Sequence, residues 1–104
     1  MNPLKNTSKR KPDRPTQHTF RGKKFNIRWK PPRDSNRVGE CDDPKYARPF
    51  MLIHPQVAGQ EKLYALLDES IHACNFDIDN DVVDVISTDI GKFLWKCGLR
   101  FRDE

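Results

Sequence analysis

Charged and apolar residues alternate along the chain from residue 24. One set comprises Phe25, Ile27 and Trp29, and the other comprises Lys24, Asn26, Arg28 and Lys30. Alternation with a period of two is typical of a half-buried β-strand. Pro31 and Pro32 end this strand, because neither can donate a hydrogen bond to a neighbouring strand. We predict a second short strand over residues 37–41 and a third over residues 49–54.

Farther along the chain, apolar residues recur at helical spacing in two segments. The first segment, residues 60–75, contains Leu63, Leu66, Leu67, Ile71 and Cys74. The second segment contains Val82, Val83, Ile86, Ile90, Phe93, Leu94 and Cys97. Asp79 or Asn80 provides the N-cap of the second helix, and Gly98 ends it. We expect both stripes to be buried, and a further short strand over residues 99–102.

The short link between the helices predicts antiparallel neighbours. We therefore predict an α+β fold, in which a three-stranded antiparallel sheet packs on an antiparallel two-helix hairpin. Residues 1–19 contain three prolines and a single large aliphatic residue, Leu4. Such a segment buries too little apolar surface to offset its ordering entropy. We expect a disordered basic tail over residues 1–19 and one domain over residues 20–104.

Charge divides the chain in the same way. Residues 1–33 hold eleven Lys and Arg and one acid, whereas residues 34–104 hold eight basic and fourteen acidic residues. The overall charge of +4 thus conceals a basic arm attached to an acidic body. A polybasic arm favours contact with nucleic acid or another polyanion.

Other classes of protein are excluded by composition. No apolar run is long enough for a transmembrane helix, and the N-terminus lacks the apolar stretch of a secretory signal. The three cysteines, without a CxxC spacing, do not favour a disulfide scaffold or a zinc knuckle. We expect a reduced, cytoplasmic protein that has no membrane segment.

The candidate chemistry lies on the first helix. Asp68 and His72 are four residues apart, the separation at which two side chains of a helix can hold one metal ion. Glu69 lies between them, where the H-E-x-x-H motif carries its general base. An exposed ion pair between Asp68 and His72 is the structural alternative.

The segment Leu67-Asp68-Glu69-Ser70-Ile71-His72-Ala73-Cys74 resembles the I-H-E-x-L-H-A-C motif of small, mostly phage-encoded zinc metallopeptidases, minimal zincins distantly similar to SprT proteins. The resemblance extends over about residues 20–102 and includes residues 39–42, residues 76–79 and the second helix. It implies a zincin-like fold and a peptide or protein substrate. It also implies that Glu69 is the catalytic base and that His72 is a zinc ligand. If the chain is phage-encoded, the protein is expected in the cytoplasm of the infected host cell.

Asp68 stands where this family has its first metal-binding histidine. An aspartate can bind zinc, but it is a harder ligand that weakens the preference for Zn²⁺ over Mn²⁺ or Mg²⁺. The predicted metal ligands are Asp68, His72 and Asp81, with Asp79, Asp84 and Asp89 as alternatives for the third. The predicted cofactor is zinc, with manganese or no metal as alternatives. The predicted activity is that of a peptidase, and the alternative is a protein that retains the fold without catalysis.

The competing function is binding of nucleic acid or of an acidic protein through the basic arm. The residues that would carry it are Lys9, Arg10, Lys11, Arg21, Lys23, Lys24, Arg28 and Lys30.

Overall fold

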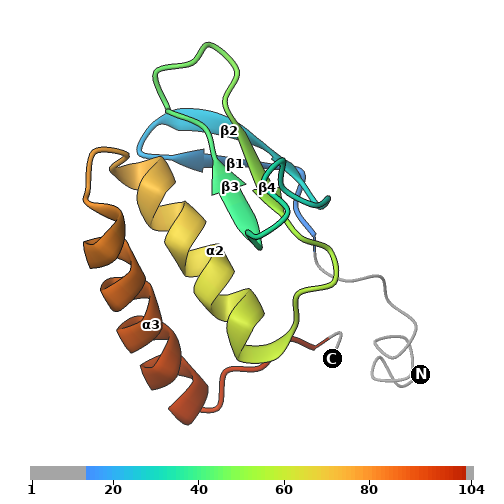
Figure 1. Ribbon diagram of the computed structural model, residues 1–104, viewed down its shortest axis with the longest axis vertical. Helices are drawn as coiled ribbons and strands as arrows, with labels where there is room; N and C mark the ends of the chain where they lie inside the picture. Colours follow the sequence, from blue (N-terminus) through green and yellow to red (C-terminus); the bar gives the residue numbers. More distant parts are fainter. Residues whose placement is uncertain (1–13, 103–104) are drawn as a thin grey trace, which may run out of the picture.

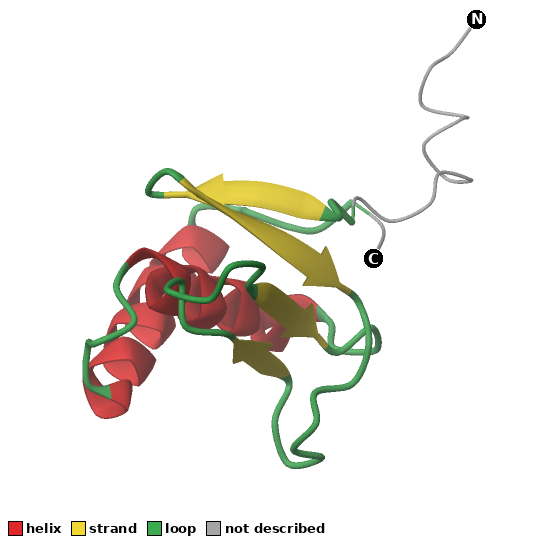
Figure 2. Cartoon of the chain, turned by 90° about the horizontal axis from the view of Figure 1, so that it is seen from above, coloured by secondary structure: helices red, strands yellow, loops and turns green. Residues whose placement is uncertain are grey.

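The helices and strands of the protein form three successive layers in a computed structural model that describes residues 14–102 (Figures 1 and 2). Helix α2 (Gly59–Cys74) covers one face of a four-stranded sheet, and α3 (Asn80–Lys96) packs on the far side of α2. The strands are β1 (Gln17–Phe20), β2 (Lys23–Arg28), β3 (Gly39–Cys41) and β4 (Phe50–Ile53). The predicted α+β class is therefore confirmed.

The sheet differs from the prediction in strand number and in direction. Its order is β1-β2-β4-β3, and β2 runs parallel to β4, with Ile27 opposite Met51. The chain leaves β2, forms β3 at the far edge, and returns to place β4 between β2 and β3. A parallel pair needs a crossover connection of a dozen or more residues, which the segment between β2 and β4 provides. The prediction of three antiparallel strands is wrong here, because alternation identifies a strand but not the direction of its partner.

The additional strand, β1, pairs antiparallel with β2 and places His18 opposite Phe25. Arg21 and Gly22 form the turn with φ values of 47° and 80°. Positive φ at both central residues is typical of a type I′ turn, whose twist matches that of a hairpin. The tail was predicted to extend to residue 19, but β1 begins at Gln17. The remainder of the predicted tail, residues 1–13, lies outside the described residues.

The core lies between the sheet and α2. Its buried members are Phe25, Ile27, Met51, Ile53 and Ala73. Trp29 packs at the edge of this cluster, as its alternation with Phe25 and Ile27 predicts, and its Nε1 donates to the Pro15 carbonyl at 3.0 Å. The apolar face of the strand predicted from residue 24 is therefore the core face of β2.

Helix α3 begins and ends as predicted, since Asp79 accepts a hydrogen bond from the Asp81 backbone and Gly98 has a φ of 98°. Its buried face agrees with the predicted stripe only in part, since Val83 is buried but Ile86 and Leu94 are partly buried. The fully buried residues are Val83, Ser87 and Gly91. Among the elements of residues 14–102, α3 contacts α2 alone, so much of the apolar stripe, including Cys97, is exposed.

Residues 99–102 do not form the predicted strand. Instead, the Arg100 guanidinium lies over the Trp95 ring, 3.8 Å from its centroid, and donates to the Trp95 carbonyl. Neither helix of the described segment has the length and the apolar character that crossing a bilayer requires.

Candidate functional site

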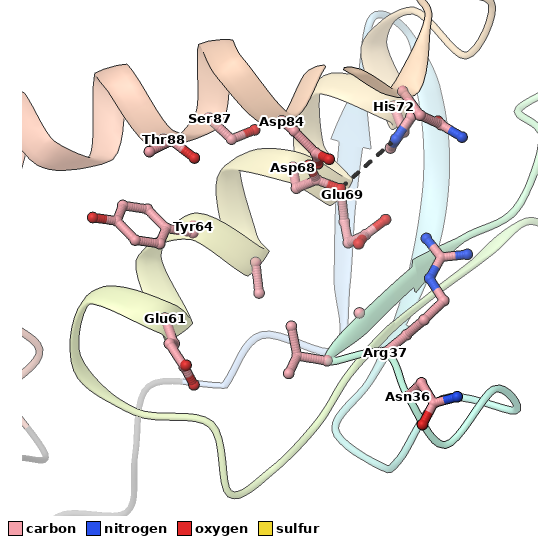
Figure 3. A pocket seen from close by; sticks show the side chains of 14 residues that line it. Asn36, Arg37, Glu61, Tyr64, Asp68, Glu69, His72, Asp84, Ser87 and Thr88 are labelled. Carbon is pink, nitrogen blue, oxygen red and sulfur yellow. Dashed lines mark ion pairs between the residues drawn. The ribbon is translucent and has the colours of Figure 1, made fainter. Parts of the chain in front are cut away.

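An open cleft of about 690 Å³ lies between α2, α3 and the start of β3. Its polar lining comes from Arg37, Tyr64, Asp68, Glu69, His72 and Asp84 (Figure 3). Side chains from α2, from α3 and from the segment that leads into β3 therefore lie around one cleft.

Asp68 and His72 lie side by side on α2, as their spacing predicts. The distance from His72 Nε2 to Asp68 Oδ2 is 3.7 Å. The His72 residue is buried, whereas the Asp68 carboxylate is partly exposed at the cleft wall. Their proximity fits both of the alternatives considered above, an ion pair and two ligands of one cation.

Glu69 is the most deeply buried of these groups, with 2% of its surface exposed. It packs against the backbone of Gly39 in β3, where an added Cβ would lie 2.7 Å from Glu69 Oε2. Glu69 Oε1 is buried and has no hydrogen-bond partner within residues 14–102. Burial, followed by the charge of Asp68, raises the pKa of Glu69 to about 8, and the charge of Arg37 opposes the increase.

Asp84 of α3 lies beside Asp68 across the two helices. Burial raises the pKa of Asp68, and the neighbouring Asp84 carboxyl adds to this by hydrogen bonding and by its charge. A cation that lay between the two carboxyl groups would relieve the repulsion that raises the pKa of Asp68. Sequence reasoning included Asp84 only as an alternative, and the helix packing brings it to Asp68.

The other acids proposed as third ligand have separate positions. Asp81 is exposed on the first turn of α3 and lines a second recess of about 660 Å³, which it shares with Glu69 and His72. Asp79 also lines that recess, but its Oδ1 accepts the Asp81 backbone N–H at 2.9 Å. Asp89 is exposed on α3 and lines neither recess. Within residues 14–102, no three His, Cys, Asp or Glu side chains form a ready-made metal site.

Several cleft residues were not identified from the sequence, and Arg37 and Ser87 bear most on the site. Arg37, just before β3, lines both recesses, and its charge lowers the pKa of Asp68 and of Glu69. Ser87 is 2% exposed, and its Oγ has no hydrogen-bond partner in the described part of the chain.

Cys41 also lines the second recess. Burial, with smaller contributions from Glu69 and other acids, raises its pKa to about 12. The thiol therefore remains protonated at neutral pH, and it donates weakly to the Asp42 carbonyl at 3.4 Å.

Five of the residues predicted to bind nucleic acid lie in the described part of the chain. Lys24, Arg28 and Lys30 are exposed, and Lys23 is half-buried. The Arg28 guanidinium lies over the Phe50 ring, 4.8 Å from its centroid. Arg21 instead donates to the Cys74 carbonyl at the end of α2. Lys9, Arg10 and Lys11 lie outside the described residues.

Comparisons with family models, with curated proteins and with solved structures gave no match. The geometry of the site therefore carries the functional argument.

Proposed function

We propose that the chain is a metal-dependent hydrolase of the peptidase type, in which Glu69 is the general base. The observation that carries this proposal is the buried Glu69 carboxyl, whose Oε1 lacks a hydrogen-bond partner within residues 14–102. A buried carboxyl without a partner is costly, and such groups concentrate at functional sites. The motif spacing of Asp68, Glu69 and His72 on α2 supports the same assignment.

The donors that would hold the metal are Asp68 and His72 of α2, with Asp84 of α3 as the third. The neighbouring carboxyls of Asp68 and Asp84 would offer a cation oxygen donors from both helices, and Asp81 is the alternative third donor. Two carboxylates and one imidazole suit Mn²⁺ as well as Zn²⁺. When bound, the metal would supply a water of lowered pKa and would polarise the scissile carbonyl.

The protein's own groups would move the proton. Glu69 accepts it at Oε1, the oxygen that has no partner in the described residues. Arg37 opposes the raised pKa of Glu69, and the charge of a cation held beside it would lower that pKa further, which favours the ionised form that this role requires. The burial of Glu69 limits the access of water, and this strengthens the electrostatic interaction between Glu69 and Arg37.

Thermal unfolding with added Mn²⁺ or Zn²⁺ tests the metal site. A ligand that binds only the native state at 100 times its Kd stabilises by about 2.7 kcal/mol, so we expect a clear rise in Tm. His72→Ala should abolish the rise, whereas His54→Ala, at a histidine outside both recesses, should preserve it. Asp84→Asn and Asp81→Asn compare the two candidates for the third ligand. An unchanged wild-type Tm with both metals would overturn the metal site.

Hydrolysis of an unstructured protein such as casein tests the reaction itself. Glu69→Gln should remove hydrolysis but leave the metal-induced rise in Tm. Asp68→His recreates the full H-E-x-x-H motif, so it should tighten Zn²⁺ relative to Mn²⁺ and increase hydrolysis. If neither the wild type nor Asp68→His shows hydrolysis that depends on Glu69, the assignment as an enzyme is wrong.

Binding of a polyanion is the second candidate, favoured by the exposed basic residues of β2. Lys24 and Arg28 alternate with buried Phe25 and Ile27, so they occupy the sheet face opposite α2. Arg28 also contributes to a shallow recess of about 260 Å³, together with Lys30 and Arg33. A duplex affinity that falls steeply with salt and is weakened by Lys24→Glu with Arg28→Glu would support this function.

A further inference from the structure

The outer face of α3 carries apolar side chains that nothing within residues 14–102 covers. Its exposed members include Val82, Val85, Ile90 and Phe93, and Phe93 is 65% exposed. The neighbouring face, with Val83, Ser87 and Gly91, is the face that packs on α2. Figure 1 shows α3 as the outermost layer of the molecule, with α2 between it and the sheet. A contiguous apolar surface of this kind typically marks an interaction site.

The apolar residues of this outer face form a regular seam. At 100° per residue, five of them fall within an arc of about 80°: Val82, Ile86, Ile90, Phe93 and Cys97. Steps of four, three and four residues separate the last four, which is the spacing of the a and d positions of a coiled coil. The seam is therefore suited to a second helix packed lengthwise along α3.

The charges beside the seam identify that helix. Asp89 and Lys96 are seven residues apart, so both flank the seam on the same side, as the g positions of successive heptads. Both are exposed, and neither forms an ion pair within the described residues. In an antiparallel pair of identical helices g positions face g positions, so Asp89 of each lies opposite Lys96 of the other. In a parallel pair g positions face e positions, which are Ser87 and Leu94 here, and neither charge would meet an opposite charge.

We propose that α3 is a dimerisation helix, which packs antiparallel against α3 of a second copy of this chain. In this register Ile90 faces Phe93 of the second copy, and Ile86 faces its Cys97. Asp84 points about 160° away from the centre of the seam, so the dimer leaves the cleft between α2 and α3 open. The proposal is independent of any catalytic role for that cleft.

Sedimentation across a range of concentrations tests the dimer. We expect Phe93→Glu to raise the dissociation constant at least tenfold, and Tyr46→Glu, at an exposed aromatic residue far from α3, to leave it unchanged. Asp89→Lys and Lys96→Asp should each weaken the dimer, and combining them should restore it. A wild type that stays monomeric would assign the seam to a different protein and overturn the proposal, as would a Phe93→Glu variant that still dimerises.

Oxidation under mild conditions tests the direction of the helices. Ile86→Cys should form a disulfide with Cys97 of the second copy, and adding Cys97→Ser should remove it. In wild type, the two Cys97 residues lie about eleven residues apart along the seam, roughly 16 Å, which is too far for a disulfide. A Cys97–Cys97 disulfide in the wild-type dimer would indicate parallel helices and overturn the proposed arrangement.

Discussion

At the scale of single residues, the polar side chains of α2 at the cleft lie at unequal depths, since Glu69 and His72 are buried and Asp68 is partly exposed. The four-residue spacing of Asp68 and His72 brings them to 3.7 Å. Leu67 belongs to the stripe predicted to be buried, but it is only partly buried, whereas Glu69 is 2% exposed. Helix α2 is covered on two sides, by the sheet and by α3, and one apolar stripe does not describe such a helix.

The burial of Glu69 has a consequence for stability. The carboxyl ionises near 4.5 when unfolded, but its pKa is about 8 in the native state. The native state therefore binds more protons between these values, and its stability falls as the pH rises from about 4.5 to 8. Glu69→Gln removes this loss, so we expect a flatter Tm profile and a Tm several degrees above wild type at pH 8.5.

Thermal unfolding from pH 4 to 9 measures this difference. Glu61→Gln is the matched control, because Glu61 is an exposed acid near the start of the same helix. Part of the slope should persist in Glu69→Gln, since the pKa of Asp68 is also raised by burial. Parallel profiles for wild type and Glu69→Gln would mean that Glu69 is ionised in the native state.

Gly39 is a second residue whose role only the three-dimensional structure reveals. An added Cβ would lie 2.7 Å from Glu69 Oε2 and 2.8 Å from its Cγ, so Gly39→Ala should cost about 1–3 kcal/mol. In the Glu69→Ala background the obstructing atoms are gone, and the same substitution should cost at least 1 kcal/mol less. Denaturant unfolding of the four proteins measures this coupling, and additive effects would exclude the close contact.

At the scale of elements, the sequence predicted both helices closely but misjudged the orientation of α3. Its longest apolar stripe is exposed, and it packs on α2 through small residues, with Gly91 directly beneath the Tyr64 ring. Small residues allow two helices to approach closely, so their pattern marks a contact that a hydrophobicity pattern does not reveal. An apolar stripe is moreover equally suited to the core and to an interface with another chain, and periodicity cannot distinguish them.

A pair of valines on α3 tests this orientation. Val83 has no exposed surface, whereas Val85 is 60% exposed. Removing two buried methyl groups leaves a cavity, so Val83→Ala should lower the free energy of unfolding by about 1–2.5 kcal/mol. Val85→Ala makes the same chemical change and should alter it by less than about 0.5 kcal/mol. Measured at low protein concentration, equal losses at the two positions would show that α3 is rotated from the orientation described here.

At the scale of the whole molecule, the sequence predicted the α+β class but not the sheet topology. The parallel pairing of β2 with β4 depends on the path of the chain between these strands, and local sequence patterns do not determine that path. The N-terminal strand was missed for a different reason. Gln17, His18 and Thr19 are polar and exposed, so β1 shows no alternation. The Arg21-Gly22 turn was the one local signal of a hairpin.

Two N-terminal truncations separate the basic segment from this strand. Deleting residues 1–13 removes Lys5, Lys9, Arg10 and Lys11, which should weaken duplex binding and make its salt dependence shallower if the arm binds phosphates. Deleting residues 1–20 also removes the pairing of β1 with β2 and the edge-to-face contact of Phe20 with Phe25, whose ring centroids are 5.6 Å apart. Losing such an aromatic contact together with an edge strand should cost at least about 2 kcal/mol, or roughly 10 °C in Tm for a domain of this size.

We therefore expect the shorter deletion to change affinity far more than Tm, and the longer one to lower Tm sharply. Equal Tm values for the two truncations would mean that β1 adds nothing to stability, and the domain would then begin at β2.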